Sequence, residues 1–134
     1  MPPTHPAQKY QMIQVESSSP EALVVVAYDL LLKLLYTSKE RLQKKEIEKS
    51  HDALKKAQLL ILQLAGALNV KVWEGGKNLL LLYDYMLERL KEANLHKKVE
   101  PVDEIIPLVK DLRDTWQEAY KKLQTQKKSA VSAS

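Results

Sequence analysis

Between Ala22 and Tyr36 the chain is apolar at thirteen of fifteen positions, interrupted only by Asp29 and Lys33. A surface helix of a soluble domain needs one apolar stripe, about 100° wide or more, with polar residues opposite. This segment is apolar on nearly every side. It must therefore be buried all round, cross a membrane, or present part of its surface to a partner, and the function depends on which of these holds.

Crossing a membrane does not fit this segment. A spanning helix needs about 20 predominantly apolar residues, whereas this stretch is shorter and holds two charges. Residues 1–19 are polar and contain proline, unlike the positively charged start of a signal peptide. We therefore expect a cytosolic protein with no membrane insertion. The chain has no cysteine, so disulfides and thiolate sites are excluded.

The pattern predicts an all-α protein, an antiparallel four-helix bundle with a flexible N-terminal segment. Ser19, Pro20 and Glu21 form a strong helix start, with a serine cap, a proline at the first position and an acid in the first turn. Short connections between helices favour antiparallel packing. The predicted helices cover residues 20–43, 46–69, 77–96 and 101–126, with Pro107 bending or loosening the start of the last. The bundle thus spans residues 20–126, between a flexible segment 1–19 and a disordered tail 127–134.

Three of these helices carry more apolar surface than one core needs. The last has a single seam, Val102, Ile105, Val109, Leu112, Trp116, Ala119 and Leu123, opposite a charged face. The first three helices also have such seams, and they carry further apolar residues on their flanks. The seams are Val24, Tyr28, Leu31, Leu35, Ser38 and Leu42 in the first helix, Ile47, Leu54, Ala57, Ile61, Leu64 and Leu68 in the second, and Leu79, Tyr83, Met86 and Leu90 in the third. Wide stripes can simply close a tight bundle, but contiguous excess surface marks a binding groove or a self-association face. We expect the groove to be lined by Val25, Leu32, Leu62, Leu80 and Leu87.

No motif in the chain supports catalysis. Glu48 and His51 have the Glu-x-x-His spacing of di-iron bundles, but a second such motif and the required inward carboxylates are missing. Gly75 and Gly76 lack the Lys-Ser/Thr continuation of a phosphate loop. We therefore expect no enzyme activity, no catalytic residues, no cofactor and no metal site. The chain has a net charge of +4, but it has no motif for a helix that binds in a nucleic-acid groove and none for stacking on bases. We therefore do not expect nucleic-acid binding.

Several segments follow one another along the chain with ordinary spacing: Tyr10-Gln11, Val15 to Glu21, Leu23 to Asp29, Leu54 to Gln58, Leu82 to Leu90 with Glu92-Ala93-Asn94, and Leu112 to Trp116. Taken in this order, they resemble the FliS family of flagellar secretion chaperones for flagellin. The resemblance covers Tyr10 to about Tyr120. It implies a cytosolic four-helix chaperone that binds the disordered C-terminal region of flagellin. Such a chaperone blocks premature polymerisation and delivers its client to a protein of the flagellar type III export gate.

The family resemblance also implies that the amino-terminal segment covers part of the empty groove. Tyr10, Met12, Ile13 and Val15 are apolar residues in an otherwise polar stretch, and we expect them to act as this plug. One of them could instead form a hydrophobic staple at the start of the first helix. Homodimerisation is possible. The alternatives to the chaperone are a structural helical-bundle oligomer without a client and, third, a protein that lies on a membrane surface.

Overall fold

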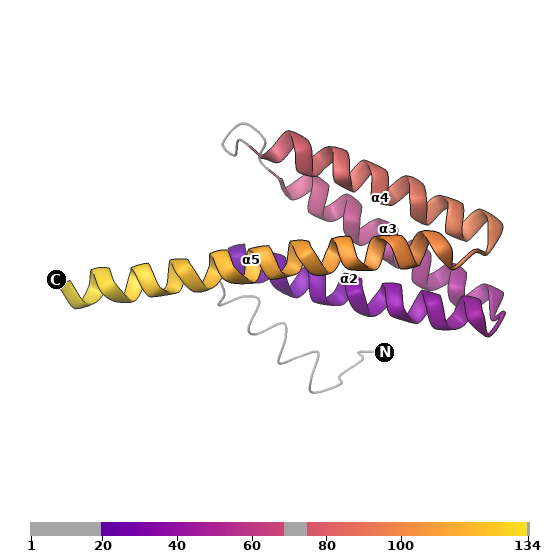
Figure 1. Cartoon of the computed structure of the whole chain (residues 1–134), viewed down its shortest axis with the longest axis horizontal. Coiled ribbons are helices and arrows are strands. Elements are labelled where there is room, and N and C mark those ends of the chain that lie inside the picture. The colour runs from indigo at the N-terminus through magenta and orange to yellow at the C-terminus, as the bar shows by residue number, and fades with distance from the viewer. Residues whose placement is uncertain (1–19, 69–74, 134) are drawn as a thin grey trace, which may run out of the picture.

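The computed structural model describes residues 20–68 and 75–133, which form four helices (Figure 1). They are α2 (Pro20–Gln43), α3 (Ile47–Ala67), α4 (Gly76–His96) and α5 (Glu100–Ala133). This all-α fold confirms the predicted class. Within the described residues, no helix combines the length and the hydropathy that crossing a bilayer requires.

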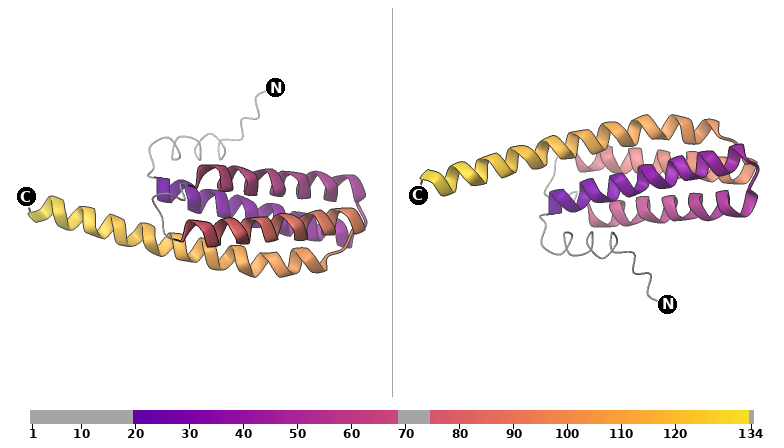
Figure 2. Two further views of the ribbon diagram at one scale, coloured as in Figure 1. Left: turned by 90° about the horizontal axis from the view of Figure 1, so that it is seen from above. Right: turned by 90° about the horizontal axis from the view of Figure 1, so that it is seen from below.

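Consecutive helices run antiparallel and close into a four-membered bundle (Figure 2). Helix α2 packs against α3 on one side and α5 on the other, and α4 also lies against both α3 and α5. The turns from α2 to α3 and from α4 to α5 lie at one end, which we call the turn end. At the opposite end α2 begins, α3 ends, α4 begins and α5 runs past them; we call it the cavity end.

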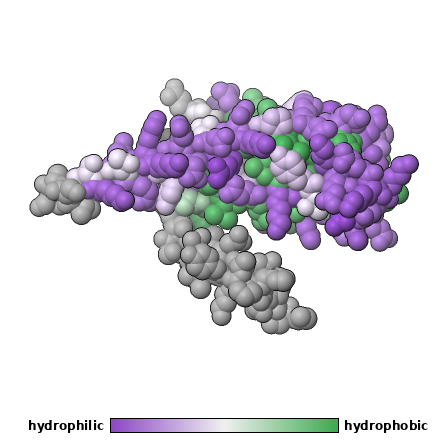
Figure 3. All heavy atoms as spheres, turned by 60° about the horizontal axis from the view of Figure 1, so that its bottom comes forward, coloured by the Kyte–Doolittle hydropathy of each residue, from purple (hydrophilic) through white to green (hydrophobic). Residues whose placement is uncertain are grey.

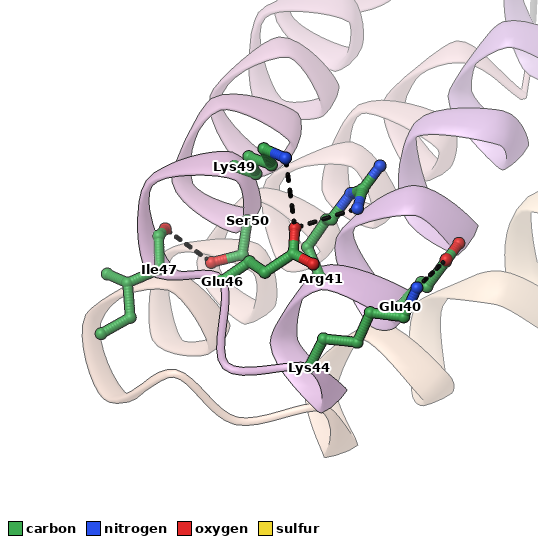
Figure 4. Close-up of polar contacts among 7 residues, drawn as sticks. All are labelled: Glu40, Arg41, Lys44, Glu46, Ile47, Lys49 and Ser50. Carbon is green, nitrogen blue, oxygen red and sulfur yellow. Dashed lines mark hydrogen bonds and ion pairs between the residues drawn. The ribbon is translucent and has the colours of Figure 1, made fainter.

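Hydrogen-bonded turns close the turn end without any glycine. Lys45 adopts a left-handed backbone with φ of 58°, its amide donates to the carbonyl of Leu42, and the Glu46 amide donates to the carbonyl of Arg41. This pattern is a Schellman motif, which satisfies the last carbonyls of α2. Figure 4 shows the Glu46 carboxylate between Arg41, at 2.9 Å, and Lys49. Lys97 ends α4 in the same left-handed conformation.

The core follows the predicted seams closely. Tyr28, Leu31 and Leu35 of α2 are fully buried, as are Met86 and Leu90 of α4. Ile47 is an exception: we expected it in the seam, but it is 60% exposed. As the first residue of α3, it lies at the rim of the turn end, where the neighbouring helices offer little surface to cover it.

Helix α5 is longer than its partners and extends past the cavity end (Figures 1 and 2). The sequence predicted a helix end near Gln126 and a disordered tail 127–134, but the helix continues to Ala133. Lysine, glutamine and alanine all favour helix, and no glycine or proline follows Pro107. The helix also runs through Pro107 without a break. Val102, Ile105 and Val109 are buried, whereas Leu112 and Trp116 are only half-buried.

Candidate functional site

A cavity of about 500 Å³ lies at the cavity end, where all four helices contribute side chains. This volume is within the range of about 300–1,000 Å³ that is typical of ligand pockets. Most of the lining is apolar, with Glu21 as the charged exception. The lining residues are Pro20, Glu21 and Val24 of α2, Leu64, Ala67 and Leu68 at the end of α3, Leu79 and Tyr83 of α4, and Trp116, Ala119 and Leu123 of α5.

Hydrogen-bonded aromatic residues lie beside this cavity. The hydroxyl groups of Tyr28 and Tyr83 are 2.5 Å apart, and Trp116 hydrogen-bonds to Tyr28. Burial raises the pKa of both tyrosines, because a phenolate would lose its hydration there. Both phenols therefore stay neutral at neutral pH and tie α2, α4 and α5 together by hydrogen bonds.

The cavity continues into a groove of about 360 Å³ between α2 and α3. Pro20, Val24, Leu64 and Ala67 line both spaces, and the groove adds Leu23, Ala27, Leu60 and Gln63. Figure 3, in which the side of the bundle carrying α2 faces the viewer, shows hydrophobic residues gathered between hydrophilic ends. The exposed Val26 and Leu30 of α2 and Leu59 of α3 extend this apolar surface outward. The uncovered surface is thus a cavity with a shallow extension.

The opposite flank of α2 is closed by α5. Asp29 accepts a hydrogen bond of 2.8 Å from Arg113, and the Lys110 ammonium lies 5.7 Å from the centre of the Tyr36 ring. Val25 and Leu32 share this flank, because spacings of three, four and seven residues place side chains on one side of a helix. Val25 is accordingly only 7% exposed, and Leu32 is half-buried against the core.

The α3–α4 flank is more open. His51 of α3 hydrogen-bonds to Asn94 of α4 near the turn end. Leu62 lies on the same side of α3 and is 55% exposed. Leu80 and Leu87 lie on the same side of α4 as Asn94 and are half-buried against the core. These leucines form an apolar border along the two helices, which we call the α3–α4 seam.

No metal-binding chemistry is visible in this part of the molecule. Within residues 20–68 and 75–133, no group of three or more histidine, cysteine or acidic side chains is placed to hold a metal ion.

Comparison with known proteins shows the family. The family described as Flagellar protein FliS matches residues 3–123. The chain belongs to the FliS family. The flagellar secretion chaperone FliS of Bacillus subtilis (strain 168) is 30% identical over 115 residues, covering 86% of this chain and 86% of that protein. Its counterpart from Escherichia coli (strain K12) is 32% identical over 121 residues, covering 84% and 87%.

A solved structure supports the fold of this FliS family member. The crystal structure of a flagellar chaperone from bacteria superimposes with a TM-score of 0.74 at 19% identity, covering 87% of this chain and 98% of that one. The family match and the curated relatives confirm the resemblance to FliS that the sequence suggested. Those relatives are named flagellar secretion chaperones, and the solved chaperone shares the fold of this chain.

The predicted groove residues of this FliS protein do not lie together. Val25 and Leu32 are on the α2–α5 flank, and Leu62, Leu80 and Leu87 are on the α3–α4 seam, on the other side of the bundle. Tyr10, Met12 and Ile13 lie outside the described residues. A role of any of these residues in partner binding stays a prediction.

Sequence reasoning missed the cavity because most of its lining residues belong to the predicted core seams. Trp116, Ala119 and Leu123 repeat with the same spacing as the buried part of α5. A helical wheel treats such residues alike, whether or not another helix covers them. Their position past the last core layer becomes visible only when the lengths and offsets of all four helices are compared.

Proposed function

We propose that this FliS-family protein is a cytosolic export chaperone that binds the disordered C-terminal region of flagellin. By covering that region it prevents premature polymerisation, and it delivers the bound client to the flagellar type III export apparatus. It works by binding alone, without catalysis or a cofactor. The observation that carries this proposal is the apolar surface that the bundle leaves uncovered, in the cavity, the α2–α3 groove and the α3–α4 seam.

Uncovered apolar surface on several sides suits an unfolded client. A disordered segment that folds on binding can wrap a large surface, and such binding commonly buries about 1,000–3,000 Å². Amphipathic helices use apolar residues at spacings of three and four to enter grooves of this kind. Several separate surfaces on one small bundle then act together, because each bound segment raises the local concentration of the next.

The amino-terminal segment has a part in this proposal. Tyr10, Met12, Ile13 and Val15 precede Pro20, which itself lines the cavity and the groove. A tethered apolar segment has a high effective concentration near its own groove, so it can shield the surface while it binds weakly. The client then competes with this plug, and its binding exposes the segment.

Co-expression with a C-terminal flagellin peptide tests the proposal. The peptide is expected to co-purify with the chaperone as a complex of defined mass, measured by light scattering after size exclusion. A peptide of the same composition in scrambled order is the matched control. If the chaperone forms a stable oligomer and retains neither peptide, the apolar surfaces serve contacts between subunits and the structural oligomer is the correct interpretation.

A further inference from the structure

The projecting end of α5 carries an unbalanced positive charge. No acidic residue follows Glu118, whereas Lys121, Lys122, Lys127 and Lys128 do. These four lysines form no ion pair within the described residues. In the bundle itself, lysines such as Lys39 and Lys44 are paired with acidic side chains at 2.8 and 2.9 Å.

These charges lie beside the apolar cavity. Trp116, Ala119 and Leu123 of α5 line the cavity, and Lys127 follows Leu123 by four residues, so it continues the same side of the helix. Lys122 follows Ala119 by three residues and borders that side. The mouth of the cavity next to α5 is therefore basic, while Glu21, the one acidic side chain among the described lining residues, belongs to α2.

We propose that the cavity receives a short amphipathic helix of the client, whose acidic residues face Lys122 and Lys127. This inference rests on the proposed function and adds the chemistry of one bound segment. The apolar residues of that helix enter the cavity between α3 and α5. Its acidic residues complement the lysines, and such exposed charges mainly set register and orientation.

A protein segment fits these observations better than another anionic partner. Nucleic acid is held mainly through its phosphates and by stacking of its bases, which leaves the apolar cavity unused. A helix that lies on an anionic membrane must turn its apolar side outward to the lipid. In α5 the apolar side chains Trp116 and Leu123 face the cavity of their own bundle instead.

Trp116 provides a direct reporter for this inference. The chain has two tryptophans, so Trp73→Phe leaves Trp116 as the only one. Adding the C-terminal flagellin peptide is expected to shift the Trp116 emission to shorter wavelength and to protect it from a soluble quencher. An emission that stays unchanged at saturating peptide, both in the full chain and in a variant lacking residues 1–16, would place the client elsewhere and overturn the inference, while the proposed function would stand.

Charge reversal tests the acidic side of the client helix. The double variant Lys122→Glu/Lys127→Glu is expected to bind the peptide about three- to tenfold more weakly by calorimetry, since exposed charge pairs are individually modest. Lys45→Glu/Lys98→Glu is the matched control, because it changes the net charge equally at exposed positions of the turn end, away from the cavity. A peptide whose acidic residues are changed to lysine should prefer the first variant. Equal weakening by both variants, or no weakening, would overturn the proposed charge complementarity.

Filling the cavity gives an independent test. Ala119→Phe occupies cavity space and is expected to weaken binding by at least about tenfold while the urea midpoint and the helix signal are kept. Unchanged affinity in a folded variant would overturn the inference. If Ala119→Phe does not fold, the Trp116 emission and the lysine variants decide alone. Failure of the unaltered protein to bind any flagellin peptide would remove the proposed function as well.

Further measurements distinguish the client helix from other occupants of the cavity and of its basic border. Vesicles of anionic lipid and duplex DNA are tested at the same salt concentration. Binding to either that requires Lys122 and Lys127, with client binding unaffected by their reversal, would assign the basic surface to that partner and overturn the proposal. Emission that moves to longer wavelength when residues 1–16 are removed, with no change on adding peptide, would assign the cavity to the chain's own amino-terminal segment.

Discussion

Leu62 allows a quantitative test of the α3–α4 seam. Complete burial of a leucine side chain contributes about 1.5–3 kcal/mol, and Leu62 is 55% exposed. A client can therefore gain only about half of that, or about 0.8–1.6 kcal/mol. If the client covers this position, the Leu62→Asp variant loses this contribution and must desolvate a carboxylate as well. The expected loss of affinity is at least about four- to fifteenfold.

The matched control is a leucine on α4 that lies outside the seam. Leu81 is 67% exposed and shares no three-, four- or seven-residue spacing with Leu80 or Leu87, so Leu81→Asp has a similar chemical effect away from the seam. Calorimetry with the C-terminal flagellin peptide measures both affinities, and urea unfolding followed by circular dichroism measures both stabilities. Both variants should keep the helical signal, with stability losses near 1 kcal/mol or less. Equal affinities for the two variants would refute the seam as a client-binding surface.

Other predictions follow from the buried tyrosines, the apolar surface and the amino-terminal segment. Tyr28→Phe should lower the free energy of unfolding by about 1–3 kcal/mol, more than Tyr83→Phe, because Tyr28 bonds to both Tyr83 and Trp116. The pKa of Tyr83 is raised in the folded protein above its value of 10.0 in the unfolded chain. The stabilisation that comes from holding this proton is therefore complete below about pH 10 and is lost as the pH rises further. Urea unfolding at about pH 9 and 11 should therefore show a smaller alkaline loss in Tyr83→Phe, and an equal loss would contradict this. Client binding should show a negative heat-capacity change and less than tenfold weakening by moderate salt in calorimetry, whereas a hundredfold weakening would point to the lysines. Removing residues 1–16 should strengthen client binding or increase self-association of the empty protein, and weaker binding by a monomeric variant would show that the segment contacts the client directly.

The helices and the core were predictable because their signals are local. Pro20 with Glu21, the three- and four-residue spacing of buried residues such as Tyr28 and Leu31, and the short connections fix helix positions without knowledge of the fold. The spacing of the residues also predicts on which side of its own helix each flank residue lies. What the sequence could not show is which neighbour covers that flank. Val25 is buried because α5 packs there, whereas Leu62, with a similar pattern, stays half exposed.

The end of α5 shows a second limit of sequence reasoning. A polar, lysine-rich run without an apolar stripe is normally interpreted as a tail, because tertiary packing supplies most helix stability. Here the run directly continues a helix whose earlier turns are anchored by Val102, Ile105 and Val109. Continuing an existing helix avoids the cost of nucleation, so good helix-forming residues suffice to extend it to Ala133.

Contacts at the turn end of the bundle contribute mainly to stability, whereas the cavity end offers a surface for binding. At the turn end, Arg41 pairs with Glu46, Lys39 with Asp103 and Arg89 with Glu104, each within 2.9 Å. Those contacts link α2 to α5 and α4 to α5, and they close the backbone turns. At the cavity end, the described residues form no ion pair across the apolar side chains of Leu64, Leu68 and Leu123. A segment that enters there needs to displace no ion pair of the turn end. Substitutions of these three leucines should therefore change affinity more than stability, and substitutions at the turn end should do the reverse, which paired calorimetry and urea unfolding can measure.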